Sequence, residues 1–238
     1  MTVRYDYDDE PWRHRLGIRV ARQYASVSLH ERVVGMLLDL GVELVLDVGC
    51  ADGVLHAALS ASGSQPTGPR LIGVDRSRTT LRTHPRPVVC ADARRLPFAD
   101  GVADAVTAIN VLYHLDDPRP AIIQAHRVLR PGGHLLAATV ARDDSPELAA
   151  YWPRPVTAFD AEDAPGLLKQ AFDTVVVHAW DAPLVTLPDP AAVRDYLLAR
   201  QAPPETAAAA ASEVSTPLTI TKRGALLHAT RLDHGTAG

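Results

Sequence analysis

The chain has 238 residues, of which 47% are hydrophobic and 22% are charged. This length suits one large α/β domain, and the composition is too apolar for a disordered protein. The formal net charge of -4 excludes an overall positive field, so we expect no nucleic acid partner, although a local basic patch would escape this average. The polar, acid-rich start and the lack of a long apolar segment predict a cytoplasmic protein without membrane contact.

The N-terminal part of the chain differs in pattern from the rest. Residues 5–40 begin with an acidic, aromatic stretch and continue with apolar residues at helical spacing, so we predict a helical extension or cap over 1–42. From residue 43, short apolar runs alternate with helical or polar stretches, which is typical of a buried parallel sheet with crossover helices. The predicted strands are 44–48, 71–74, 88–91, 105–109 and 135–140, and the predicted helices between them are 54–62 and 118–129. This alternation predicts a doubly wound α/β sheet.

The regular alternation ends after residue 140, where prolines flank aromatic residues. We expect lid segments at about 141–170 and 180–216, inserted into a domain that spans 43–238. The remaining predicted elements are a strand at 174–178, helices at 190–199 and 206–214, and a last strand at 225–230. Cys50 and Cys90 each end an apolar run and show no metal-like spacing, so we expect both to be buried, reduced thiols.

A glycine-containing turn at 47–53 follows the first predicted strand and precedes a helix. Gly49 and Gly53 permit a tight turn and the close approach of a ligand to the backbone. The dinucleotide-binding fingerprint requires glycine at its first, third and sixth positions, but Ala51 and Val54 stand at the third and the sixth. A pyrophosphate-binding turn is therefore disfavoured.

Acidic residues end the next two predicted strands. Asp75 is placed to accept hydrogen bonds from both hydroxyls of a ribose at the sheet edge, and Asp92 is placed to accept one from the exocyclic amine of adenine. Either residue alone fits a helix cap or a turn better than a ligand role. Two acids at successive strand ends together favour an adenosine-containing ligand.

Several segments together resemble class I S-adenosylmethionine (SAM) dependent methyltransferases, in particular the methyltransferase type 11 group with its quinone-biosynthesis-like enzymes. They are V-L-D-V-G-C-A-D-G (45–53), G-V-D (73–75), A-D-A (91–93) followed by L-P-F (96–98), the strand 104–109 leading to Asn110, and R-V-L-R-P-G-G (127–133), with a weaker match at 221–227. The resemblance spans about residues 43–139. It implies a Rossmann-like doubly wound sheet of seven strands whose last strand is antiparallel, with SAM as cofactor and S-adenosylhomocysteine as product.

The resemblance also implies which residues form the cofactor site. By position, the residues around the methionine part of SAM are Asp47, Gly49, Cys50 and Gly53; those at the ribose and the adenine are Asp75, Arg76, Asp92 and Ala93; and those near the sulfonium are Asn110 and Val111. Ala51 stands where the family usually has glycine, so we expect a modest backbone adjustment rather than lost binding.

His114 is the first candidate for a general base, because it follows the fourth predicted strand at the edge where the family's methyl donor and acceptor meet. A loop histidine that only shapes the pocket is the alternative. A metal site of His114, Asp116 and Asp117 is disfavoured, because this spacing supplies too few ligands and Asp117 before Pro118 fits a helix cap; we expect no metal.

The methyl acceptor is expected to be a small molecule. Aromatic residues that fit an apolar acceptor pocket are Tyr24, Tyr113, Tyr151 and Trp152. Taken alone, Tyr113 fits ordinary packing equally well, and each of the other three fits it better. Residues 110–113 resemble the N-P-P-Y signature of enzymes that methylate base amines but lack both prolines, which also disfavours nucleic acid as the acceptor. The sequence therefore favours a SAM-dependent methyltransferase that acts on oxygen, nitrogen or carbon. An NAD(P)-dependent oxidoreductase and a non-catalytic SAM-binding module remain as alternatives.

Overall fold

The computed structural model describes residues 10–64 and 67–232, and its central feature is a seven-stranded sheet with the spatial order β3-β2-β1-β4-β5-β7-β6. The strands are β1 (Leu44–Val48), β2 (Arg70–Asp75), β3 (Val88–Cys90), β4 (Ala103–Ile109), β5 (Leu129–Val140), β6 (Thr174–Leu187) and β7 (Leu218–Thr230). Strand β1 pairs in parallel with β2 and β4, and the ladder continues in parallel to β3 on one side and β5 on the other. The last strand is antiparallel, so the predicted Rossmann-like mixed sheet is confirmed.

The chain divides into two compact units, each built from separate stretches. We call the described residues of Met1–Ser28, Val140–Val156 and Ala179–Gly224 the helical unit, and those of Leu29–Thr139, Thr157–His178 and Ala225–Gly238 the sheet unit. The helices of the sheet unit are α2 (Leu29–Asp39), α3 (Val54–Ala61), α4 (Arg78–Leu81), α5 (Arg119–Val128), α6 (Ala164–Leu168) and the 3-10 helix η1 (Leu112–His114). Those of the helical unit are α1 (Pro11–Tyr24), η2 (Pro146–Leu148), α7 (Pro190–Ala199) and α8 (Pro204–Glu213).

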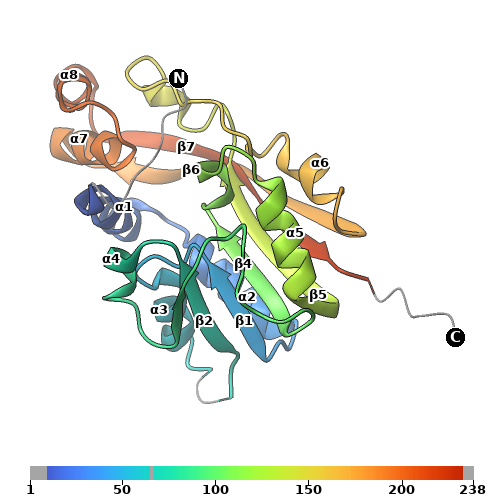
Figure 1. The fold of residues 1–238 in the computed structure, drawn as a ribbon. Helices are drawn as coiled ribbons and strands as arrows, with labels where there is room; N and C mark the ends of the chain where they lie inside the picture. The colour runs from blue at the N-terminus through green and yellow to red at the C-terminus, as the bar shows by residue number, and fades with distance from the viewer. Residues whose placement is uncertain (1–9, 65–66, 233–238) are drawn as a thin grey trace, which may run out of the picture. The chain divides into compact units, whose positions relative to one another are not determined.

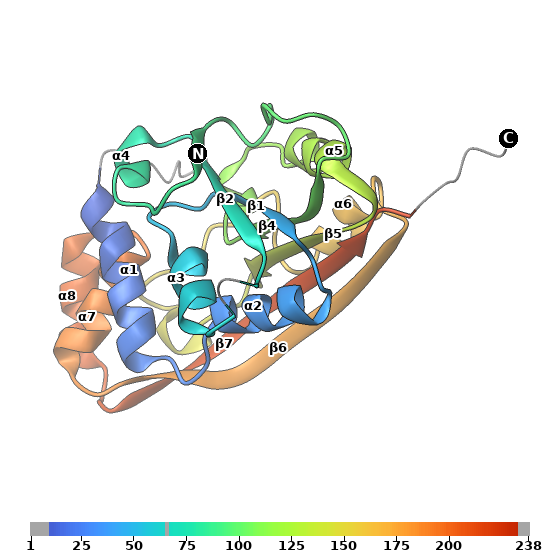
Figure 2. The same cartoon turned by 90° about the horizontal axis from the view of Figure 1, so that it is seen from below.

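The sheet unit has helices on both faces of its strands. Helix α5 lies against β4 and β5 in Figure 1, while α2 and α3 lie on the opposite face in Figure 2. Apolar side chains from β4, β5 and α5, such as Val106, Leu135 and Ile122, form one continuous core. Leu135 is 1% exposed, so its replacement by Ala would cost about 3 kcal/mol. This rigid core fixes the ends of β1, β2 and β4, which carry the candidate site.

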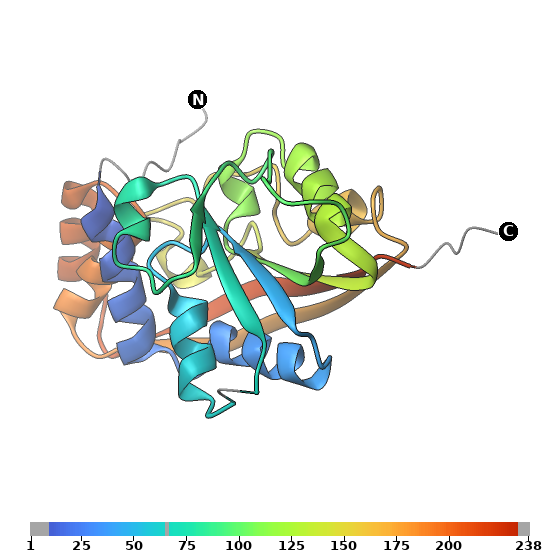
Figure 3. The same cartoon turned by 60° about the horizontal axis from the view of Figure 1, so that its bottom comes forward.

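The helical unit is held together by small side chains and caps. Helices α1, α7 and α8 lie side by side in Figure 3. Ala207 and Ala210 of α8 are fully buried, because their small side chains allow the close approach of this alanine-rich helix. At its start, α7 is capped by the Asp189 carboxylate, which accepts the Ala192 amide at 2.8 Å. Arg13 of α1 is 7% exposed and donates to carbonyls near the end of α7.

The predicted N-terminal helical extension contains two helices: α1 and α2 are separated at Ala25, which bridges to Val185, and residues 1–9 lie outside the described residues. The predicted strands 174–178 and 225–230 need correction. Strands β6 and β7 are longer than predicted. The end of β6 was missed because its side chains alternate between exposed and half-buried and include Pro183, which an edge strand tolerates.

Cys90 is exposed and not buried as predicted, because β3 is a three-residue strand at the other edge of the sheet. Cys50 is buried, as predicted, and neither cysteine forms a disulfide. Among the described helices, none is long and apolar enough to cross a membrane.

Candidate functional site

The turn after β1 contains residues in the left-handed backbone conformation, which favours glycine and other small residues. Gly49 has a φ of 75°, and a Cβ atom added there would lie 2.3 Å from Cγ2 of Val111, so no side chain fits. Gly53, with a φ of 92°, stands at the start of α3. Ala51 also adopts a left-handed conformation, with a φ of 46°, so the backbone adjustment expected at this position takes the form of strain within the turn.

The Asp75 carboxylate, at the end of β2, supports this turn. Its Oδ2 accepts the Ala51 amide at 2.9 Å, and its Oδ1 accepts the Ser77 amide at the same distance. Each carboxylate oxygen has a second lone pair, so Asp75 retains acceptor capacity for a pair of hydroxyls. The turn and the end of β2 are therefore one connected structure.

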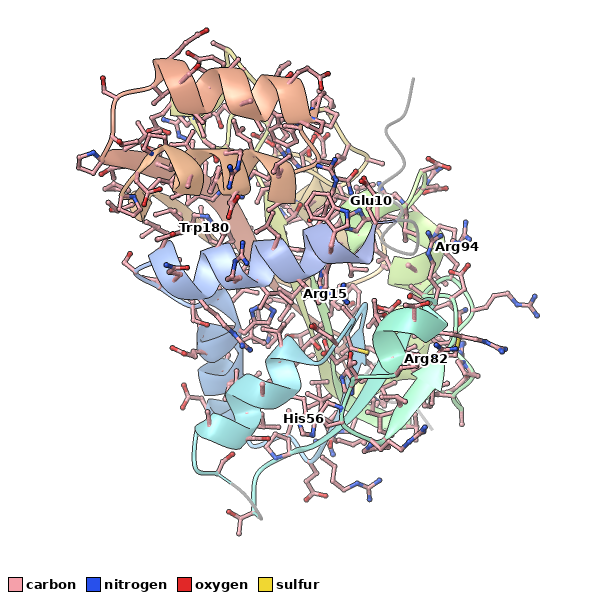
Figure 4. The ribbon with its side chains drawn as sticks, turned by 90° about the vertical axis from the view of Figure 1, so that its left-hand side faces the viewer. Glu10, Arg15, His56, Arg82, Arg94 and Trp180 are labelled. Atoms are coloured by element: carbon pink, nitrogen blue, oxygen red, sulfur yellow. The ribbon has the colours of Figure 1, made fainter. Side chains whose placement is uncertain are left out.

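The Asp92 carboxylate, after β3, is held by Arg94. The Arg94 guanidinium donates to both carboxylate oxygens, with the shortest bond at 2.6 Å, and the Arg94 amide adds another at 2.8 Å. These hydrogen bonds, aided by the charge of exposed Arg76, hold the pKa of Asp92 below its ordinary value. Arg94 is labelled in Figure 4, as is Arg82 at the end of α4. Asp92 is thus an ionised, oriented acceptor beside half-buried Ala93.

The Asp47 carboxyl lies inside the sheet unit. It is 4% exposed, and its Oδ1 accepts the hydroxyl of Thr107 at 2.7 Å. Burial raises the pKa of Asp47 to about 7, the Thr107 hydrogen bond opposes the rise, and the charge of Asp75 adds to it. Burial also raises the pKa of the Cys50 thiol, so Cys50 stays protonated and unreactive at neutral pH.

The end of β4 supplies a further polar atom. Asn110 has a φ of 55° and donates its amide to the Ala138 carbonyl at 2.9 Å, while its side-chain Oδ1 is buried with no hydrogen-bond partner among the described residues. Val111 follows, and then η1, in which the rings of Tyr113 and His114 lie 4.3 Å apart. Tyr113 and His114 are both half-buried.

The residues at these strand ends fit SAM. An adenosyl sulfonium presents hydroxyls, an exocyclic amine and an ammonium group, all of which are donors. The structure offers acceptors to match, namely the carboxylates of Asp75 and Asp92 and the unpaired Oδ1 of Asn110. The sequence predicts Asp75 and Asp92 as acceptors from their place at the strand ends, whereas only the family resemblance implies Asn110.

Three contacts around these residues were not predicted. Thr107 bonds Asp47, Arg94 holds Asp92, and His84 fills the space beside Gly53 and Gly73. The His84 ring is 5% exposed, and its Nε2 has no hydrogen-bond partner in the described part of the chain. Only Arg94, two residues from its partner, carried a local sequence signal.

The metal alternative gains no support. The Asp117 carboxylate accepts the backbone amide of Arg119 at 3.0 Å and also binds the Arg119 guanidinium. This is a cap-like contact at the start of α5, although Pro118 occupies the formal cap position. In residues 10–64 and 67–232, no group of three or more His, Cys, Asp or Glu side chains is arranged to hold a metal ion.

The predicted acceptor residues fall in both units. Tyr113 belongs to the sheet unit, whereas Tyr24, Tyr151 and Trp152 belong to the helical unit and pack against its core. The Tyr151 hydroxyl donates to Glu213 at 3.0 Å, and the hydrogen bond raises the pKa of this tyrosine. Their role toward an acceptor stays a prediction.

The sheet topology and the acidic strand ends define a class I SAM-dependent methyltransferase fold. Residues 46–137 match the type 11 family model described as "Methyltransferase domain". This stretch contains the ends of β1, β2 and β4 that carry the candidate site, so the similarity to the family lies in the part of the chain that would hold the cofactor.

Named proteins share parts of the chain or its fold. The O-methyltransferase cnsE of Penicillium expansum is 38% identical over 143 residues, covering 54% of this chain and 51% of cnsE. A SAM-dependent methyltransferase from Thermotoga maritima is 17% identical with a TM-score of 0.57, covering 94% of each chain. The (4+2)-cyclase SpnF is 19% identical with a TM-score of 0.57, covering 88% of this chain and 87% of SpnF. The structural likeness shows the fold alone, and the chain spans about half the length of cnsE.

Proposed function

We propose that this protein transfers the methyl group of SAM to an oxygen, nitrogen or carbon atom of a small-molecule acceptor. The observation that carries the proposal is the set of acceptors at neighbouring strand ends. Asp75 accepts the amide of Ala51 in the glycine turn, the Ala91 amide beside Asp92 donates to the Asp75 carbonyl at 3.0 Å, and Asn110 after β4 has an unpaired Oδ1. When bound, SAM supplies an electrophilic methyl group on a cationic sulfur.

The sheet unit supplies the proposed cofactor contacts. Asp75 accepts from the ribose hydroxyls with Arg76 beside it, and Asp92 accepts from the adenine amine over Ala93. The methionine part lies along the turn formed by Asp47, Gly49, Cys50 and Gly53, while Asn110 and Val111 face the sulfonium. Every one of these contacts orients the reactants, which is the main source of rate for a direct transfer that needs no metal.

We propose His114 as the general base that takes the proton released by a hydroxyl or amine acceptor. The supporting observation is its place in η1, which follows Asn110 and Val111 after β4, and in which the amide of His114 donates to the Val111 carbonyl at 3.0 Å. A histidine is suited to this role because its ordinary pKa lies near neutrality. The variant His114→Ala should keep its affinity for S-adenosylhomocysteine and lose turnover.

For the acceptor, an oxygen atom on a small molecule is the first choice. The relative cnsE is named an O-methyltransferase, and we propose that Tyr113, beside His114 in η1, contacts the acceptor. No contact with nucleic acid or a membrane is part of this proposal.

The direct test is calorimetry of the full chain with S-adenosylhomocysteine. We expect binding to the unaltered protein and a loss of about tenfold or more in Asp75→Ala and in Asp92→Ala, because each removes a charged acceptor. Asp39→Asn is the matched control, since Asp39 is an exposed acid at the end of α2. No binding at millimolar ligand would overturn the proposal.

Two further measurements separate the alternatives. Enhanced NADH fluorescence in place of S-adenosylhomocysteine binding would support an oxidoreductase. Tight S-adenosylhomocysteine binding with no methyl transfer across a broad acceptor screen would support a non-catalytic module. Binding and transfer have to be measured separately, because a protein named a cyclase shares the fold.

A further inference from the structure

A surface groove of about 550 Å³ lies within the helical unit, between α1 and α7. Its lining consists of Trp12, Arg15, Leu16, Arg19, Arg194, Asp195 and Leu198. The volume falls within the range of small-molecule sites. Figure 4 shows α1 with Arg15 labelled on it. No residue of this groove is among those proposed above to bind SAM or its acceptor.

The groove has an excess of positive charge. Its only carboxylate in the lining, Asp195, accepts from Arg19 at 2.9 Å and from Arg194 at 3.1 Å, so one negative charge is shared by two guanidinium groups. The third arginine of the lining, Arg15, is exposed, and its guanidinium has no ion pair or hydrogen bond in the described part of the chain. An anion that entered the groove would meet an unpaired guanidinium, which presents several donors in a fixed plane.

The same groove presents an aromatic surface. Trp12 is 42% exposed, while Leu16 behind it is 8% exposed and belongs to the core of the unit. The Arg13 guanidinium lies 4.7 Å from the centre of the Trp12 ring and donates to the Leu198 carbonyl at 2.8 Å. The Trp12 side chain is thus braced by a residue anchored on α7. A ligand ring would bind a surface that is already ordered.

We propose that this groove binds a small, planar aromatic carboxylate. Its ring lies against Trp12 and Leu16, and its carboxylate receives hydrogen bonds from Arg15. The combination decides the ligand class: charge alone would suit any anion, and the tryptophan alone any ring, whereas the groove supplies both within one site of ligand size. The proposal does not depend on SAM binding.

The test uses 2-naphthoate as the probe and its uncharged analogue 2-naphthamide as the comparison, with calorimetry of the full chain at low salt. We expect one molecule of 2-naphthoate to bind, and 2-naphthamide to bind at least about tenfold more weakly, since it lacks the charge. Arg15→Gln should lower the affinity for 2-naphthoate about tenfold, and Trp12→Leu should lower the affinity for both compounds. Arg22→Gln is the matched control, because Arg22 is an exposed arginine in the last turn of the same helix and outside the groove.

Three results would each overturn the proposal: no binding of 2-naphthoate to the unaltered protein at about 5 mM, equal affinity for the amide, or equal weakening by Arg15→Gln and Arg22→Gln. Circular dichroism of each variant confirms that it is folded. Arg15 is exposed, so its replacement leaves the core intact. Because S-adenosylhomocysteine binding is measured on the same samples, failure here is distinguishable from failure of the proposed methyl transfer.

Discussion

Thr107 on β4 donates its hydroxyl to the buried carboxylate of Asp47 on β1, with 2.7 Å between the two oxygens. The parallel register places the two residues directly opposite each other, so the bond is a consequence of strand pairing. The bond favours the ionised form of Asp47, but burial outweighs it and raises the pKa to about 7. A carboxyl that titrates near neutral pH therefore lies directly beneath the glycine turn.

Asp47 makes the stability of the protein depend on pH. Its pKa in the folded state, about 7, exceeds its ordinary value of 3.8, so the folded chain binds a proton that the unfolded chain has released. The free energy of unfolding should consequently fall as pH rises from about 4 to about 7, by a few kcal/mol. Asp47→Asn keeps an acceptor for Thr107 and cannot ionise, so at pH 8 it should be more stable than the unaltered protein.

Urea unfolding at about pH 5 and about pH 8 tests this expectation. The stability advantage of Asp47→Asn should be clear at the higher pH and shrink at the lower. Thr107→Val, which removes the hydrogen bond, should raise the pKa of Asp47 further. Parallel pH profiles for the unaltered protein and Asp47→Asn would show that Asp47 does not titrate in this range.

Ala51 should tolerate glycine and reject a β-branched residue. At a φ of 46°, an L-residue costs about 1–2 kcal/mol, while glycine gives back about 0.4–1 kcal/mol through its freer unfolded chain. The free energy of unfolding of Ala51→Gly should therefore lie within about 1 kcal/mol of that of the unaltered protein, whereas that of Ala51→Val should be lower by at least about 1 kcal/mol. Thermal unfolding measures both, with Ala99→Val as the control at an exposed loop position without a positive φ. A harmless Ala51→Val would mean that the turn relaxes freely.

Arg94 should act on the cofactor through Asp92. The Arg94 guanidinium fixes the Asp92 carboxylate and lowers its pKa, so removing it leaves a mobile carboxylate that protonates at higher pH. Arg94→Ala should lower the affinity for S-adenosylhomocysteine about threefold to tenfold. The loss is modest because the side chains of Arg94 and Asp92 are both partly exposed. The loss should grow as the pH is lowered toward about 4.

The adjacent exposed residue Arg95 offers the control for this prediction. Arg95→Ala should bind like the unaltered protein at every pH, and calorimetry at about pH 4.5 and about pH 7.5 makes the comparison. Equal affinities for Arg94→Ala and Arg95→Ala would remove Arg94 from the cofactor site.

The acidic strand ends could be predicted because a strand, its last residue and the following turn are close in sequence. Asp75 and Asp92 needed only the pattern of the strands before them, and Gly49 only its place in the turn. The Asp47 to Thr107 bond could not be predicted in this way, since it depends on the register between β1 and β4. His84 beside Gly73 likewise depends on how the loop before β3 folds back.

The helical unit was the hardest part to predict. Its three stretches are separated by the sheet unit in sequence, so no local pattern joins Arg13 to the carbonyl of Leu198. The sequence predicts a shorter strand than β6 because Pro183 suggests a loop. The strand tolerates Pro183 because β6 lies at the edge of the sheet. The hydrogen bond from Arg13 and the length of β6 both depend on the topology of the chain and not on its composition.

A buried ion pair should control the stability of the helical unit. The ammonium group of Lys222 on β7 binds the carboxylate of Asp144. Its Nζ also donates to the hydroxyl of Ser145 at 3.1 Å and to the hydroxyl of Tyr196 at 3.2 Å. Burial would raise the pKa of Asp144, but the charges of Lys222 and Arg200 outweigh it and the pKa is lowered, so Asp144 is ionised at neutral pH. Lys222→Met leaves Asp144 charged among buried groups and should cost about 3–5 kcal/mol.

The double variant Lys222→Met with Asp144→Asn separates the unpaired charge from the loss of the pair itself. It removes both charges at once, so it should recover most of the stability lost in the single variant. Lys169→Met serves as the control, since Lys169 is an exposed lysine at the end of α6. Urea unfolding of both single variants, Lys222→Met and Asp144→Asn, of the double variant and of the control gives the interaction energy. If the double variant is no more stable than Lys222→Met, the stability comes from packing of the lysine stem and not from its charge.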